Sequence, residues 1–229
     1  MYRSLDSLKI INTITVLEER IQRRFPDSGL LRINHELLEV ARQTKQKSEA
    51  ILKPNFVLRF IAGVAIFVII LLLGLSIYHI QHNDTLTLNE FIQVLEAGLN
   101  DLVLIGAAIF FLVTFENRIK REKCLTLLHE LRVLAHVVDM HQLTKDPEKV
   151  FGSSKNNDDV SEERLSKFEL YRYLDYSSEM LSLIGKIAAL YIQHFNDPVV
   201  ISTVNEIEEL TTGLSRKIWQ KIMILQSYK

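Results

Sequence analysis

Hydrophobic residues recur every three or four positions along four segments of the chain, with polar residues on the remaining sides. This spacing gathers apolar side chains on one face of an α-helix. We therefore predict amphipathic helices at about residues 4–25, 30–52, 162–195 and 198–226. Pro26 to Gly29 is a turn signal between the first two helices, and Asp197 followed by Pro198 suits an N-cap and first helical position. The last helix also approaches the heptad pattern of a coiled coil.

A different pattern occupies Phe60 to Tyr78, which is apolar and carries no charge. Nineteen residues of helix measure roughly 28 Å, close to the roughly 30 Å hydrocarbon core of a bilayer. We therefore predict a transmembrane span at about residues 57–80.

A second span is predicted at about residues 94–115. Its uncharged run, Leu102 to Phe115, has fourteen residues and is too short to cross a bilayer alone. Extending the helix towards its amino-terminal end adds Glu96 and Asp101. The alternative is a buried or re-entrant helix.

Charge along the chain predicts which ends of the spans face the cytoplasm. Residues 79–101 contain acidic side chains and no lysine or arginine, whereas Arg59 and the segment 118–123 belong to basic flanks. Basic flanks remain on the cytoplasmic side. We therefore expect an integral, multi-pass protein of the cell or inner membrane, with both termini cytoplasmic.

The predicted fold class is an all-α membrane protein, in which a two-span transmembrane helical hairpin carries a cytoplasmic helical bundle built from the N- and C-terminal helices. Residues 144–163 are charged, rich in glycine, serine and asparagine, and aperiodic, which is typical of a flexible linker. The expected parts are an αα-hairpin (1–53), the transmembrane hairpin (54–118) with an outside loop at about 81–90, a cytoplasmic extension of the second span (119–143), the linker (144–163) and a C-terminal hairpin (164–229).

Composition narrows the function classes. The chain has 229 residues, with 27 basic and 28 acidic side chains, so it lacks the basic excess typical of nucleic-acid binders. Its single cysteine, Cys124, excludes an internal disulfide. The sequence contains no GxSxG elbow and no glycine-rich phosphate loop. We therefore expect neither enzymatic activity nor a cofactor.

A polar stripe on the predicted helix before residue 143 is the main candidate for chemistry. His129, Arg132, His136 and Asp139 follow spacings of +3, +4 and +3, which place them on one helical face. The apolar surroundings of His136 predict that this face is buried. One interpretation is a metal or proton site. Another is a hydrogen-bonded His–Asp pair, or a charge pair with Arg132.

The weak metal candidates are His136, Asp139 and His129, and a complete site requires further ligands such as Asp175, Glu179 or His35. A separate aromatic group could line a pocket or mark the edge of the core. It consists of Phe168, Tyr171, Tyr173 and Tyr176.

Asp101 is the intramembrane polar candidate, because a charged group within a bilayer is costly and usually functional. At the outer interface its cost is far smaller, so an interfacial position is the alternative. Small residues in the spans would allow close helix approach, either within the hairpin or between copies. They include Gly63, Gly74, Gly98 and Gly106.

These patterns favour a non-enzymatic membrane anchor whose cytoplasmic helical module self-assembles or binds a protein partner. The lipid bilayer is the expected environment and no nucleic-acid partner is expected, whereas the sequence does not identify a small-molecule ligand. The layout of helix, two spans and long cytoplasmic helix resembles that of SLATT-type bacterial membrane effectors. That resemblance, in layout alone, implies the first alternative, an oligomeric ion channel or pore with Asp101 at its mouth. A metal-dependent activity at His136 and Asp139 is the second alternative.

Overall fold

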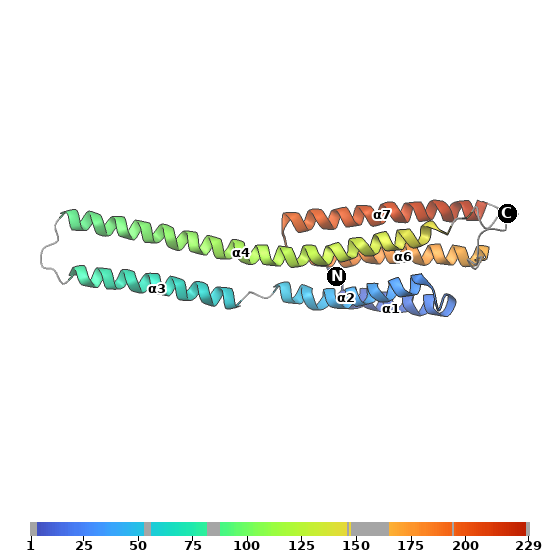
Figure 1. The fold of residues 1–229 in the computed structure, drawn as a ribbon, viewed down its shortest axis with the longest axis horizontal. Helices are drawn as coiled ribbons and strands as arrows, with labels where there is room; N and C mark the ends of the chain where they lie inside the picture. The colour runs from blue at the N-terminus through green and yellow to red at the C-terminus, as the bar shows by residue number, and fades with distance from the viewer. Residues whose placement is uncertain are drawn as a thin grey trace. The chain divides into compact units, whose positions relative to one another are not determined.

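The computed structural model describes residues 4–52, 56–81, 88–145, 147, 165–193 and 195–227, and these residues form helices with no strand among them (Figure 1). The all-α prediction is therefore confirmed for the described part of the chain. The helices are α1 (Ser7–Arg24), α2 (Gly29–Leu52), α3 (Phe56–Gln81), α4 (Leu88–Leu143), α6 (Lys167–Ile192) and α7 (Pro198–Ser227).

Local side chains fix several helix ends. At the start of α1, Asp6 Oδ1 accepts hydrogen bonds from the backbone N–H groups of Leu8 and Lys9. At the start of α7, Asp197 Oδ1 accepts from Val199 N at 3.0 Å and Val200 N at 3.2 Å. A capping side chain satisfies donors that lack an intrahelical acceptor. The predicted N-cap at Asp197 is confirmed.

The chain divides into two compact units, which are described separately. The bundle unit comprises Met1–Leu52 and Lys123–Lys229, and the apolar unit comprises Lys53–Glu122. Most of the predicted linker, residues 148–163, lies outside the described residues, as do residues 82–87 of the predicted outside loop.

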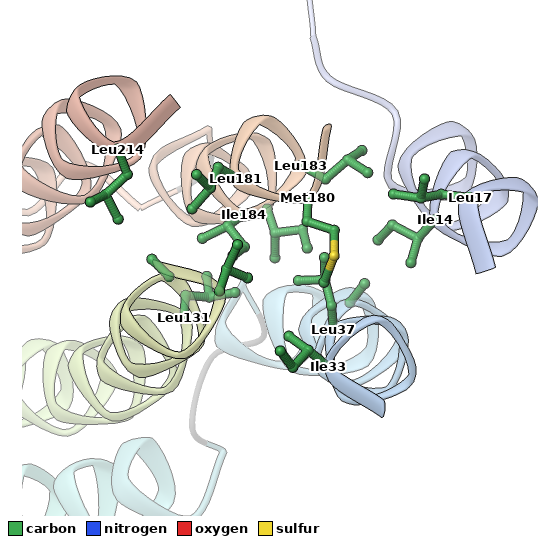
Figure 2. Packing of buried hydrophobic residues seen from close by; sticks show 14 of the residues in the cluster. Ile14, Leu17, Ile33, Leu37, Leu131, Met180, Leu181, Leu183, Ile184 and Leu214 are labelled. Carbon is green, nitrogen blue, oxygen red and sulfur yellow. The ribbon is translucent and has the colours of Figure 1, made fainter. Parts of the chain in front are cut away.

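The bundle unit has one hydrophobic core, with α6 at its centre. Residues on nearly every side of α6 are buried, which is expected of a helix surrounded by others. Figure 2 shows the core side chains converging from α1, α2, α4, α6 and α7. Labelled members include Ile14, Leu17, Ile33, Leu37, Leu131, Met180, Leu181, Leu183, Ile184 and Leu214.

Two buried polar contacts add specificity to this core. Tyr191 of α6 donates its hydroxyl to Thr44 Oγ1 of α2 at 2.9 Å, and Thr44 in turn donates to the Val40 carbonyl at 2.7 Å. Asn34 of α2 donates to the Ile14 carbonyl of α1 at 3.3 Å. Buried polar groups need such partners, so these bonds constrain the register of α2 against α1 and α6.

The apolar unit differs because its large hydrophobic side chains are exposed. Phe60 of α3 is 73% exposed, and Val103 and Phe110 of α4 are 69% and 74% exposed. By length and composition, one helix in the described residues, Leu95–Leu143, could cross a membrane, and Arg59–Leu71 is a shorter apolar helix. The apolar window of Leu95–Leu143 is unburied.

The glycines of the apolar unit have no close neighbours among the side chains that the structure describes. Within that part of the chain, a Cβ added at Gly63, Gly74, Gly98 or Gly106 would meet nothing within 4 Å. The interpretation that these glycines let the two helices of one hairpin approach closely therefore stays a prediction.

Candidate functional site

A cluster of arginines lies where the last turns of α1 meet the first turns of α6. Arg20, Arg23, Arg24 and Arg172 line an open cleft of about 510 Å³, together with Tyr176. We call these five residues the arginine cleft. Arg23 and Arg24 occupy the final turn of α1, where cations interact favourably with the carbonyl end of the helix.

Arg20 is held rigidly in the arginine cleft. Its Nη1 and Nη2 donate to the two carboxylate oxygens of Glu179 on α6, at 2.8 and 3.0 Å. Its guanidinium also lies over the Tyr176 ring, 4.9 Å from the centroid. The hydrogen bonds to Glu179 raise the pKa of Arg20. This paired side chain joins α1 to α6.

Phe168 holds two more arginines in place. The Cζ atom of Arg24 lies 4.8 Å from the centroid of its ring, and that of Arg172 lies 5.6 Å away. Such stacking orients the flat guanidinium groups. Arg172 also donates from Nη1 to Asp175 Oδ2 at 3.3 Å. Aromatic stacking therefore brings cations from α1 and α6 to the same ring.

The beginning of α6 is fixed by a capping box next to this cluster. Ser166 Oγ accepts from Glu169 N at 3.2 Å, while the Ser166 N–H and hydroxyl donate to Glu169 Oε2 at 2.8 and 2.7 Å. These hydrogen bonds lower the pKa of Glu169, and the nearby charge of Arg24 lowers it further. The cap thereby sets where Phe168 and Arg172 project from α6.

Part of the predicted aromatic group belongs to this site. Tyr176 lines the arginine cleft, and Arg172 lies 5.8 Å from the Tyr171 ring centroid. Tyr173 is buried and meets Phe25 edge-on at 5.7 Å, so it belongs to the core. Burial raises the pKa of Tyr173 to about 12.

The polar stripe of α4, formed by His129, Arg132, His136 and Asp139, was predicted to be buried, but both of its histidines are exposed. The buried face of α4 carries Leu127, Leu128, Leu131, Ala135 and Val138, whereas His129 and His136 are exposed. The interpretation of His136 as part of a buried His–Asp pair is therefore wrong.

The neighbours of His136 on the stripe have other partners. Asp139 Oδ1 accepts a hydrogen bond from Gln142 Nε2 at 2.7 Å. Arg132 pairs with Glu206 of α7, with 2.6 Å between Nη2 and Oε2. Arg132 was expected to pair with a charged neighbour on its own helix. It instead forms an ion pair with a residue of another helix, Glu206 of α7.

The further ligands suggested for a metal site are also engaged elsewhere. Asp175 contacts Arg172, Glu179 pairs with Arg20, and His35 Nδ1 lies 3.0 Å from Glu18 Oε1. Among the described residues, no three His, Cys, Asp or Glu side chains lie together in a way that could hold a metal ion. The structure therefore does not bring His136, Asp139 and His129 together with the further ligands suggested for a metal site.

Asp101 lies in the apolar unit on α4, between exposed apolar residues in the sequence. Its side chain is half-buried, while Leu99 and Leu102 are 57% and 67% exposed. At the other end of this unit, Arg59 Nε lies 3.5 Å from Glu116 Oε2, and Lys120 Nζ lies 2.8 Å from Glu116 Oε1. The charged side chains of Arg59, Glu116 and Lys120 therefore lie together near the start of α3.

Sequence reasoning missed the arginine cleft as a site. The spacing of Arg20, Arg23 and Arg24 was a usable signal, because residues three and four apart share a helix face. Nothing local indicated that Arg172 of α6 would join them.

No family model matches the chain, and comparisons with the curated proteins and with the solved structures give no match. The site must therefore be interpreted from its own geometry.

Proposed function

We propose that this chain is a non-enzymatic integral membrane protein, in which α3 and the first part of α4 form a two-span hairpin that anchors a cytoplasmic helical module. The observation that carries the proposal is the exposure of the large apolar side chains in the apolar unit. Apolar surface of this extent is unfavourable in water and suits a lipid environment or another chain. The bundle unit, by contrast, has its own buried core.

Charge placement supports the proposed orientation. Arg59, Glu116 and Lys120 lie together at one end of the apolar unit. Basic residues concentrate on the cytoplasmic side of membrane proteins. We therefore assign this end, and with it both chain termini, to the cytoplasm.

Extraction of membranes that contain the full chain tests integral insertion. After an alkaline carbonate wash, an inserted hairpin remains in the membrane pellet, whereas a peripheral protein is released. A matched variant, Val64→Arg with Val103→Arg, places a charge in each predicted span, where each costs about 2.5–3.5 kcal/mol on insertion scales. We expect the native chain in the pellet and reduced insertion of the variant. Complete release of the native chain would contradict the proposal.

Self-assembly is the second part of the proposal. Gly63, Gly74, Gly98 and Gly106 have open space beside them, so they offer small surfaces for helices of another copy. Crosslinking in membranes, followed by native mass spectrometry in detergent, should show a discrete oligomer. A strict monomer without any bound protein would refute both self-assembly and partner binding.

A pore is the alternative that Asp101 favours. A half-buried carboxylate on an otherwise apolar helix would suit the mouth of a cation pathway. Ion flux into liposomes that contain the protein tests this alternative, and Asp101→Asn should reduce cation preference. Absence of conductance at every protein density would exclude it.

A further inference from the structure

The arginine cleft has the size of a small-molecule site. Its volume of about 510 Å³ falls within the range of roughly 300–1,000 Å³ typical of ligand pockets. Four of its five lining residues are arginines, contributed by α1 and α6. The arginine cleft is independent of the apolar unit, so this inference does not depend on the proposed membrane anchor.

Several donors in the arginine cleft have no acceptor within the described residues. Arg172 Nε has no hydrogen-bond partner there, but it is shielded from solvent, so Arg172 would contact a ligand through its terminal nitrogens, of which Nη1 donates to Asp175. Arg23 donates from Nε to the Glu19 carbonyl at 3.2 Å, which leaves its two terminal nitrogens available. A guanidinium offers five N–H donors in a fixed fork. Arg23, Arg24 and Arg172 therefore present more donors than the nearby acceptors use.

The charge in the arginine cleft is also incompletely balanced. Glu179 neutralises Arg20 through a two-bond contact, and Asp175 makes one longer contact with Arg172. The carboxylate of Glu169 also lies near enough to Arg24 for the two charges to interact, but its hydrogen bonds go to Ser166. In the described part of the chain, neither Arg23 nor Arg24 forms an ion pair. Cations held close together repel one another, and an anion between them would relieve this repulsion.

We propose that the arginine cleft binds the phosphate group of a phosphate-bearing ligand. A single carboxylate has two oxygens, and one arginine can satisfy both. A phosphate presents three terminal oxygens and up to two negative charges, which match guanidinium groups contributed by Arg23, Arg24 and Arg172. The stacking of Arg24 and Arg172 on Phe168 fixes these groups before the ligand arrives.

Binding would also connect two parts of the bundle unit. Arg23 and Arg24 belong to α1, and Arg172 belongs to α6. A phosphate held between them would strengthen the same α1–α6 contact that Arg20 and Glu179 already make. The bound ligand should therefore raise the melting temperature of the bundle unit, since it binds the folded state alone.

Titration of the purified full chain in non-ionic detergent with inorganic pyrophosphate tests the assignment. We expect saturable binding and a rise in melting temperature. The variant Arg23→Gln with Arg24→Gln should weaken binding by about tenfold or more, because it removes charge-assisted hydrogen bonds. Both side chains are exposed, but the variant loses the Arg24 contact with Phe168 and the Arg23 hydrogen bond to the Glu19 carbonyl, so the ligand-induced rise in melting temperature is measured against the unliganded value of each variant. The control, Arg216→Gln with Lys217→Gln, removes two exposed charges from α7 and should bind as the native chain does.

Mixed micelles that contain phosphatidylglycerol distinguish the two sources of phosphate. If the headgroup is the ligand, the lipid competes with pyrophosphate in the native chain and in the α7 control. If the ligand is a soluble compound, the lipid leaves pyrophosphate binding unchanged. Both results support phosphate recognition. Lack of saturable pyrophosphate binding, or equal weakening by the α1 and α7 variants, would overturn the proposal.

Discussion

The position of a residue on its helix face determines its contribution to the stability of the bundle unit. Leu131 and His136 are five residues apart on α4, yet Leu131 is fully buried and His136 is exposed. We expect Leu131→Ala to lower the free energy of unfolding by about 2–5 kcal/mol. His136→Ala should change it by less than about 0.5 kcal/mol. Unfolding of the full chain followed by circular dichroism measures both values.

Val133→Ala is the matched apolar control, because Val133 is 45% exposed on the same helix. Its effect should resemble that of His136→Ala. A large loss of stability in His136→Ala would restore the buried His–Asp interpretation. That interpretation was wrong because His136 and Asp139 are the only polar residues between Val133 and Met140, whereas packing against the other helices buries only one face of this run, which carries Ala135 and Val138. Met140, at 61% exposure, shows that an apolar neighbour is no guarantee of burial.

Ionisation of Cys124 should lower the stability of the bundle unit at alkaline pH. Burial raises its thiol pKa from 9.0 to about 11. Between these values the unfolded thiol loses its proton while the folded thiol retains it, so stability falls as pH rises. The slope from this residue is at most about 1.4 kcal/mol per pH unit. Cys124→Ala should reduce the loss of stability between pH 9.0 and about 11, measured by thermal unfolding across that range.

Burial also raises the pKa of Tyr173 to about 12, from an ordinary value of 10.0, so part of the alkaline loss should remain in Cys124→Ala. Tyr173→Phe provides the second measurement. An unchanged pH profile in Cys124→Ala would show that the thiol ionises equally in the folded and unfolded chain.

At the level of helices, the sequence predicted those ends that a strong local signal marks. The start of α6 was predicted at about residue 162, whereas the helix begins at Lys167, after the Ser166 cap. Asp197 caps the N-terminus of α7, and the predicted turn at Pro26 to Gly29 separates α1 from α2. The arginine cleft could not be predicted in the same way. Arg20 and Glu179 are 159 residues apart, and their contact depends on how α1 packs against α6.

The packing of α6 against α7 can be tested with two glycines. A Cβ added at Gly185 of α6 would lie 3.3 Å from Thr211 Oγ1 of α7, whereas one added at Gly213 would meet nothing within 4 Å. Alanine favours a helix over glycine by about 0.5–1 kcal/mol. Gly213→Ala should therefore stabilise the chain by about this amount, and Gly185→Ala should be less stable than Gly213→Ala by about 1 kcal/mol or more.

Thr211→Ala serves as the control for this comparison, since it removes the oxygen that crowds Gly185. Combined with Gly185→Ala, it should show a favourable coupling in a double-mutant cycle. Additive effects of the two substitutions, or equal stabilisation at both glycines, would contradict the close approach of the two helices.

At the scale of the whole molecule, the two units have surfaces suited to different surroundings. The bundle unit has a buried core of large apolar side chains contributed by its own helices, whereas most of the large apolar side chains described in the apolar unit are exposed. The hydrophobic pattern predicted this contrast, because amphipathic periodicity and uninterrupted apolar runs have different physical requirements. The assignment of both termini to the cytoplasmic side of the membrane rests on the distribution of charged residues alone. It therefore needs a direct test.

Labelling of single introduced cysteines in right-side-out membrane vesicles provides that test, with a membrane-impermeant maleimide as the reagent. Cys124 is buried, so the native chain should remain nearly unlabelled. Asn83→Cys, in the predicted outside loop, should react in sealed vesicles. Gln226→Cys, exposed near the end of α7, should react only after permeabilisation. Protection of residue 83 together with labelling of residue 226 in sealed vesicles would contradict the proposed membrane topology.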